Sequence, residues 1–148
     1  MSITAKDFFS GEEQEHIKQA IMHAELDTSG QIRVHIENSC KGEVLDRAAY
    51  VFHKLGMTKT KHRNGVLIYL AVRDRKFAII GDHAINKVVP PDFWDSVKLG
   101  MLEYFQKGEY STGLVYAATE VGKHLKQYFP HLQDDVNELP DDISFGKK

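Results

Sequence analysis

Hydrophobic residues recur every three or four positions in four segments of this chain, which is the spacing of a helix that buries one face. The four predicted helices run between Ser10 and Ala24, Leu45 and Leu55, Trp94 and Phe105, and Ser111 and Tyr128. Ser10 and Glu13 have the spacing of a capping box at the start of the first helix. Gly56 follows the second helix and Pro130 follows the fourth, at positions where these residues end helices.

Three shorter segments have the pattern of β-strands. Residues 32–36 alternate apolar and polar side chains, which predicts a strand with one apolar face and one polar face that carries His35. Residues 66–72 are apolar without alternation, as in a strand that is covered on both faces. Residues 76–80 form the third strand, and the turn at 73–75 is short enough to allow only an antiparallel hairpin.

The order of these elements predicts the fold class. A helix joins the first two strands, so these strands should lie parallel with a right-handed crossover. The pattern predicts an α/β fold, a three-layer α/β/α sandwich with a small mixed sheet flanked by about four helices. Residues 1–132 are expected to form a single domain, with residues 81–91 as a loop. Residues 133–148 are acidic and contain Pro140, and we expect them to form an extended tail.

Composition narrows the classes of function. The 148 residues are 42% apolar and 27% charged, which is typical of one folded domain. The formal net charge of −2 provides no basic excess, so nucleic acid is not expected as a partner. No apolar run approaches the roughly 18 residues that cross a bilayer, and the N-terminus lacks the pattern of a secretory signal. Cys40 is the single cysteine, which excludes an intrachain disulfide, and a cytoplasmic location is the expectation.

Polar residues gather at one end of the predicted sheet. The first two strands begin near Gly30 and Gly65, and the antiparallel third strand ends near Gly81, so the loops at these points should lie together. These loops and the start of the third helix supply mostly oxygen ligands, which calcium and magnesium prefer. The candidate ligands of a Ca²⁺ or Mg²⁺ ion are Asp27, Ser29, Asn64, Asp82, His83, Asp92 and Asp95. The alternative to metal binding, for each aspartate, is a purely structural role, because Asp favours turns and helix N-termini.

The opposite end of the sheet offers a second candidate site. Arg73 and Arg75 lie in the predicted hairpin turn, near the start of the second helix. Guanidinium groups and helix N–H groups together suit a phosphate, so a phosphorylated small molecule or protein is a candidate partner there. The alternative is that these charges only keep the turn hydrated.

Several short motifs follow one another in a specific order and spacing. They are Thr28–Val34 at the first strand, Arg63–Ile68 at the second, Asp74–Lys76 and Ile80–Gly81 in the hairpin, and Phe105–Gly113 between the last two helices. In this order they resemble the motifs of the TPM domain family, over about Phe8 to Phe129. The resemblance implies an α/β/α sandwich, and it also implies calcium binding or acid phosphatase activity, which are described for members of the family.

Three functions are compatible with these observations. The first is a domain that binds a divalent cation without catalysis. The second is a metal-dependent acid phosphatase, which only the resemblance suggests. Gln31 and Ile85 stand where the family commonly has acidic residues, whereas Asp82 and His83 are additional here. The third is a protein-interaction module that uses the acidic tail or the basic loop at 59–63.

Overall fold

The computed structural model describes residues 5–131, 139–140 and 143–146, and a mixed sheet forms its centre. In this part of the chain, the sheet contains β1 (Gln31–Glu37), β2 (Gly65–Ala71), β3 (Lys76–Gly81) and β4 (Ser144–Phe145), in the order β3-β2-β1-β4. As predicted, β1 is parallel to β2 and β3 is antiparallel to β2. A helix between β1 and β2 and a short turn between β2 and β3 impose these directions.

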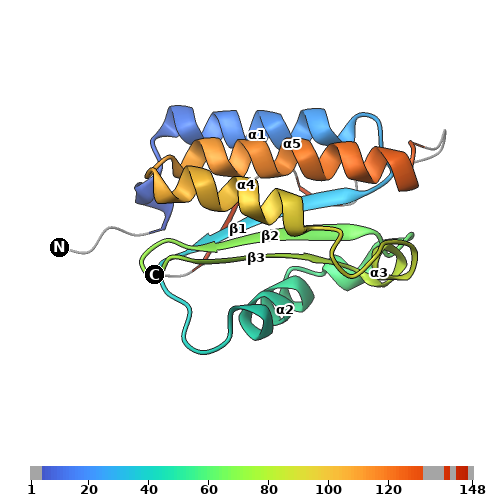
Figure 1. Cartoon of the computed structure of the whole chain (residues 1–148), viewed down its shortest axis with the longest axis horizontal. Coiled ribbons are helices and arrows are strands. Elements are labelled where there is room, and N and C mark those ends of the chain that lie inside the picture. The colour runs from blue at the N-terminus through green and yellow to red at the C-terminus, as the bar shows by residue number, and fades with distance from the viewer. Residues whose placement is uncertain (1–4, 132–138, 141–142, 147–148) are drawn as a thin grey trace.

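Helices cover both faces of the sheet and confirm the predicted α/β/α layers (Figure 1). One face carries α1 (Gly11–Glu25), α4 (Asp95–Gln106) and α5 (Tyr110–Tyr128), and the other carries α2 (Val44–Lys54). Short 3₁₀ turns, η1 (Lys6–Phe8) and η2 (Met57–Lys59), precede α1 and β2. Among the described residues, no helix is both long and apolar enough to cross a membrane.

Two helix-end signals in the sequence act as predicted. The Ser10 hydroxyl accepts the N–H of Glu13 at 3.0 Å, and the Glu13 carboxylate accepts the N–H of Ser10 at 2.9 Å. This capping box satisfies backbone donors that α1 would otherwise leave unpaired. Gly56 follows α2 with a φ of 75°, a left-handed conformation that glycine adopts without strain.

One helix was not predicted. The segment 81–91, which was expected to be a loop, contains α3 (His83–Val88) at one end of the sheet. Asp82 caps this helix, because its carboxylate accepts the N–H of His83 at 2.7 Å. With 6 residues, α3 makes fewer than two turns, which is too short for helical periodicity to appear in the sequence.

The polar face of β1 is buried rather than exposed to solvent. Ile32, Val34 and Ile36 enter the larger core beneath α1, α4 and α5, as the alternation predicts. The polar residues between them are also at most 8% exposed, and they are Gln31, Arg33, His35 and Glu37. Burial on this face follows from the position of β1 between β2 and β4 and from α2, which lies on the same face of the sheet.

Ser144 and Phe145, within the segment 133–148 that was expected to be an extended tail, form a strand of the sheet. β4 pairs in parallel with β1, and the N–H of Gly146 donates to the carbonyl of Ile36 at 2.8 Å. Leu139 and Ile143 are each 8% exposed. The N–H of Leu139 donates to the Gln31 side chain at 3.1 Å, so a distant segment satisfies part of the buried polar face. Residues 133–138, 141–142 and 147–148 lie outside the described residues.

Candidate functional site

One end of the sheet brings together three of the seven predicted metal ligands. Ser29 precedes β1, Asn64 precedes β2 and Asp82 follows β3, and the strand register puts these three positions at the same end of the sheet. The Asn64 amide donates to the Ser29 hydroxyl at 3.1 Å, and the N–H of Asp82 donates to the carbonyl of Gly65 at 2.9 Å. The Asn64 side-chain oxygen is buried and has no hydrogen-bond donor in the described part of the chain. This end therefore contains a buried acceptor that is not satisfied.

The charge of Asp82 is balanced by Arg63, a residue that the sequence analysis did not select as a site residue. Asp82 is 6% exposed, and its two carboxylate oxygens accept N–H groups of Arg63 at 2.7 and 2.9 Å. These hydrogen bonds raise the pKa of the Arg63 guanidinium. The Arg63 side chain is 45% exposed, so it can leave Asp82 without opening the core. A metal ion at Asp82 would have to displace this guanidinium.

A pocket of about 330 Å³ opens beside Asp82. His83, Asn86 and Thr58 supply further polar atoms to its wall, and apolar side chains of α2 and β3 complete it. The sequence pattern did not point to Thr58 or Asn86, because α3 and η2 bring them there from loops expected to lack structure. Carboxylate, amide and hydroxyl oxygens together form a donor set that suits Ca²⁺ or Mg²⁺.

The three remaining predicted ligands, Asp27, Asp92 and Asp95, do not join Asp82 in one cluster. Asp27 is exposed and lies 3.7 Å from the Lys126 ammonium on α5. Asp92 and Asp95 are exposed at the turn before α4 and at its first residue. Within residues 5–131, 139–140 and 143–146, no group of three or more His, Cys, Asp or Glu side chains is close enough to hold a metal ion. Any cation site at Asp82 would therefore need amide, hydroxyl, backbone or water oxygens.

The opposite end of β1 contains a buried charged network that sequence reasoning missed. The Glu37 carboxylate accepts two N–H groups of Arg47 on α2, at 2.8 and 2.9 Å. The Tyr69 hydroxyl also donates to Glu37, and a ring nitrogen of His35 lies 3.3 Å from it. The other ring nitrogen of His35 lies 3.0 Å from the hydroxyl of Ser144 in β4. The network thus joins β1, β2, β4 and α2.

Burial and hydrogen bonds set the protonation states of Glu37 and Tyr69 in this network. Burial alone would raise the pKa of the Glu37 carboxyl, but hydrogen bonds from Arg47, His35 and Tyr69 lower it far below its usual range. Burial and the hydrogen bond to Glu37 raise the pKa of the Tyr69 hydroxyl. Glu37 is therefore ionised and Tyr69 neutral at physiological pH, and the oxygens of Glu37 are already occupied by donors. This arrangement suits a structural network better than a reactive site.

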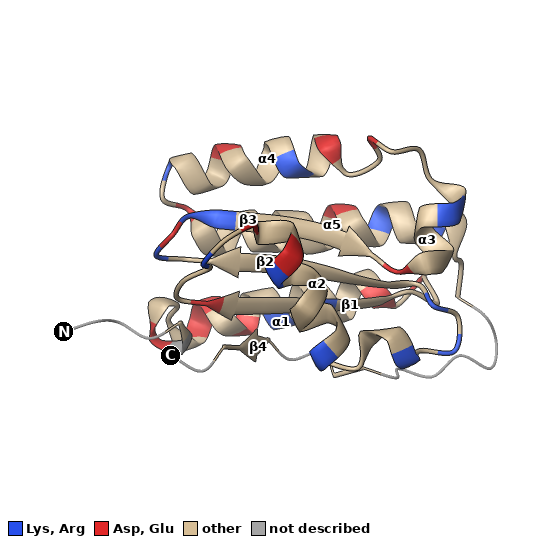
Figure 2. Ribbon diagram, turned by 90° about the horizontal axis from the view of Figure 1, so that it is seen from below, with Lys and Arg blue, Asp and Glu red and all other residues tan. Residues whose placement is uncertain are grey.

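The two predicted anion-binding arginines have different surroundings. Arg73 is exposed, and its N–H donates to the carbonyl of Asn38 at 2.8 Å. Arg75 lines a pocket with residues of β2, β3, α4 and α5, on the face of the sheet opposite α2. Figure 2, viewed from the α2 side, shows charged residues at both ends of the central strands. Arg73 does not line this pocket, and anion binding by the two arginines stays a prediction.

Comparisons with known proteins agree with this architecture. Residues 3–124 match the model of the TPM domain family. The chain is 47% identical to the BA42 protein from the psychrophilic bacterium Bizionia argentinensis, whose NMR structure superposes with a TM-score of 0.89 over 95% of this chain and 97% of that one. The N-terminal domain of a P. gingivalis protein is 18% identical, with a TM-score of 0.68 over 84% and 82% of the two chains, a likeness of fold alone. A comparison with curated proteins finds no match.

Proposed function

Because the chain belongs to the TPM domain family, and because Asp82 lines an open pocket at the end of its sheet, we propose that this domain binds a divalent cation, calcium or magnesium, beside Asp82. The observation that carries the proposal is the environment of the Asp82 carboxylate. Asp82 is buried, yet it forms part of the wall of a solvent-open pocket that is also lined by His83, Asn86 and Thr58.

Arg63 affects the expected metal affinity, because its guanidinium already provides the positive charge that Asp82 requires. Two charge-assisted hydrogen bonds hold it, at 2.7 and 2.9 Å, but the side chain remains half exposed. A divalent ion would compete with Arg63 for the same oxygens. Binding should therefore be weak in the native protein and stronger when the competing guanidinium is removed.

Titration of Ca²⁺ and Mg²⁺, followed by backbone amide shifts, tests the proposal. We expect the native protein to respond at residues 58, 63–65 and 81–86, the Arg63→Gln variant to respond at lower metal concentration, and the Asp82→Asn variant to lose the response. Asp92→Asn is the matched control, because Asp92 is an exposed candidate ligand outside the pocket. If Asp82→Asn and the native protein titrate alike, the site is not at Asp82.

A second measurement separates binding from catalysis. A generic phosphomonoester is incubated with the native protein and with Asp82→Asn, each at the same concentration of Ca²⁺ or Mg²⁺. A binding domain gives equal background rates for both proteins. Hydrolysis by the native protein that disappears in Asp82→Asn would instead identify a metal-assisted phosphatase, in which the cation polarises phosphate oxygens and activates water.

A further inference from the structure

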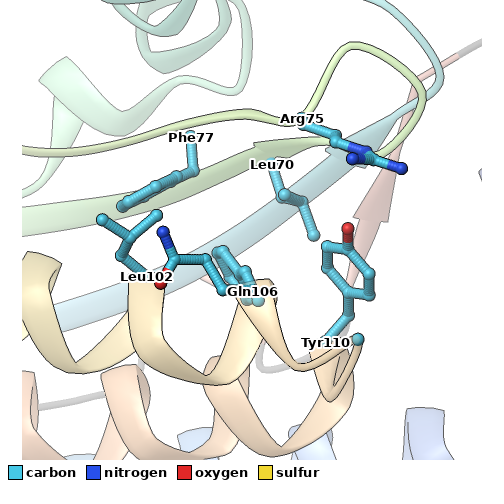
Figure 3. Close-up of a pocket in the computed structure, with 8 residues that line it drawn as sticks. Leu70, Arg75, Phe77, Leu102, Gln106 and Tyr110 are labelled. Carbon is cyan, nitrogen blue, oxygen red and sulfur yellow. The ribbon is translucent and has the colours of Figure 1, made fainter.

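A second pocket lies at the opposite end of β3 from Asp82, between the β2–β3 hairpin and the corner that joins α4 to α5 (Figure 3). Its volume is about 420 Å³, which is within the range of small-molecule sites. We call it the hairpin pocket, and its lining residues are Leu70, Arg75, Phe77, Leu102, Phe105, Gln106, Gly108 and Tyr110.

The inner wall of the hairpin pocket is apolar and well ordered by ring contacts. Leu70 and Phe105 are 1% and 8% exposed, so they form part of the core. The ring of Phe105 packs edge to face on Phe77 with centroids 5.2 Å apart, and it stacks on Tyr110 at 5.2 Å. Three aromatic rings and one leucine therefore present a fixed apolar surface, which suits an aromatic or branched aliphatic group.

The rim of the hairpin pocket is polar and carries one positive charge. Figure 3 shows the Tyr110 hydroxyl pointing toward the Arg75 guanidinium at one side of the opening, with the Gln106 amide at the other side, near Leu102. The lining contains no acidic residue. Within the part of the chain that the structure describes, the Arg75 side chain has no hydrogen-bond or ion-pair partner. A guanidinium with free N–H donors binds a planar carboxylate in a bidentate manner.

The neighbouring charges of the hairpin do not add to this rim. The Lys76 ammonium donates to the carbonyls of Cys40 and Gly42, at 3.0 and 2.9 Å. The Asp74 carboxylate accepts the N–H of Cys40 at 2.7 Å, so it too is directed to the loop before α2. A single positive charge matches a monoanion better than a phosphate dianion, which favours a carboxylate head group.

We propose that the hairpin pocket binds a small carboxylic acid with an aromatic or branched apolar body, whose carboxylate meets Arg75 and Tyr110 while its apolar part lies against Leu70, Phe77 and Phe105. The site is separate from the cation pocket at Asp82. It needs neither Arg73 nor the start of α2.

The test uses 4-phenylbutyrate and indole-3-acetate as probes, with their uncharged amides as matched ligands, in metal-free buffer. Binding is followed by amide shifts of residues 70–77 and 102–110. We expect the native protein to bind the acids at least about tenfold more tightly than the amides, because a charge-assisted hydrogen bond typically changes affinity by this factor or more. Arg75→Gln should abolish this preference while the amides bind as before.

Arg73→Gln is the matched control, since it removes the same charge from the same turn but from a residue that does not line the pocket. It should retain the preference for the acids, and both variants should keep native amide dispersion. Three results would each overturn the proposal: no shifts in the two segments at millimolar probe, equal affinity of acid and amide for the native protein, or loss of the preference in Arg73→Gln as in Arg75→Gln. Because no metal is present, none of these results bears on the cation pocket.

Discussion

Glu37 is the residue whose surroundings explain the most about the smaller half of the core. The residue is 4% exposed, and a buried charge of this kind is stable only when donors surround it. Arg47 supplies two of those donors from α2, and Tyr69 supplies another from β2. A single side chain thereby links a helix to the sheet that it covers.

Replacing Arg47 with methionine should destabilise the fold by about 2 to 3 kcal/mol, because it leaves the Glu37 charge buried and less well paired. The value lies below that of a fully buried pair, since the Arg47 side chain is 39% exposed and partly screened. Urea unfolding measures the change. The double variant Glu37→Gln with Arg47→Met should be more stable than Arg47→Met alone, and the opposite order would show that the charge is not the cause.

The lowered pKa of Glu37 predicts a loss of stability in acid. In the unfolded chain this carboxyl titrates near 4.5, and in the folded protein it titrates far lower, so the folded state holds fewer protons between these values. Its contribution is complete above about pH 4.5 and is lost progressively as the pH falls below it. Urea unfolding between pH 7 and pH 3 should show a smaller decrease for Glu37→Gln than for the native protein. Parallel decreases would exclude Glu37 as a source of the acid sensitivity.

At the scale of elements, α1 and α5 pack against each other with almost no space between their backbones. A Cβ atom added to Gly122 on α5 would lie 2.6 Å from the Cβ of Ala24 and 2.9 Å from its Cα. Backbone atoms cannot rotate away, so the two helices would have to separate. The absence of a side chain at Gly122 therefore sets the distance between these helices.

Gly122→Ala should destabilise the protein by about 1 to 2 kcal/mol, because the overpacking exceeds the gain in helix propensity. Thermal unfolding provides the measurement. Gly11→Ala is the control, since a Cβ atom there meets nothing within 4 Å, and it should change stability by no more than about 0.5 kcal/mol. Equal effects of the two substitutions would mean that helix contact is not responsible.

The C-terminal segment acts as an element of the sheet. A chain that ends at residue 138 loses β4 and the buried side chains of Leu139 and Ile143, so it should be less stable by about 3 kcal/mol or more. The denaturation midpoint measures this loss. Ser144→Ala removes only the contact with His35 and should cost about 1 kcal/mol or less. An unchanged midpoint in the truncated chain would show that the segment is dispensable for folding.

At the scale of the whole molecule, the two proposed sites lie at opposite ends of β3, with Asp82 after its last residue and Arg75 before its first. A strand of 6 residues spans about 20 Å, so the sites do not share ligands. Each can bind without the other, and each stabilises the folded state in proportion to its own occupancy.

Binding of the proposed cation should therefore raise the melting temperature of the entire domain. At a metal concentration of 100 times Kd, the gain is about 2.7 kcal/mol, or a rise of roughly 5 to 10 °C for a domain of this size. Differential scanning calorimetry with Ca²⁺, Mg²⁺ or EDTA tests this effect. Asp82→Asn should melt at one temperature in all three conditions, and a metal-dependent rise in that variant would move the site elsewhere.

The local pattern of apolar and polar residues was sufficient to predict most of the layers and the directions of the strands. Helical spacing around Ile17 and Leu114 and alternation around Val34 reflect contacts within a few residues along the chain. The short turn before Lys76 allowed only a hairpin, and this placed Ser29, Asn64 and Asp82 at one end. These features were predictable because their physical cause lies within the segments themselves.

The sequence by itself determined the α/β/α layers, the capping box of α1 and the directions of the central strands, because these depend on local pattern and connection length. The tertiary structure alone decided that Arg63 neutralises Asp82, that Arg47 and Tyr69 neutralise Glu37, and that β4 covers the edge of β1. It also placed Arg75 at the rim of an apolar pocket on the face of the sheet opposite α2. The partner of a buried charge is selected by proximity in space, and residues distant in sequence carry no periodic signal of that proximity.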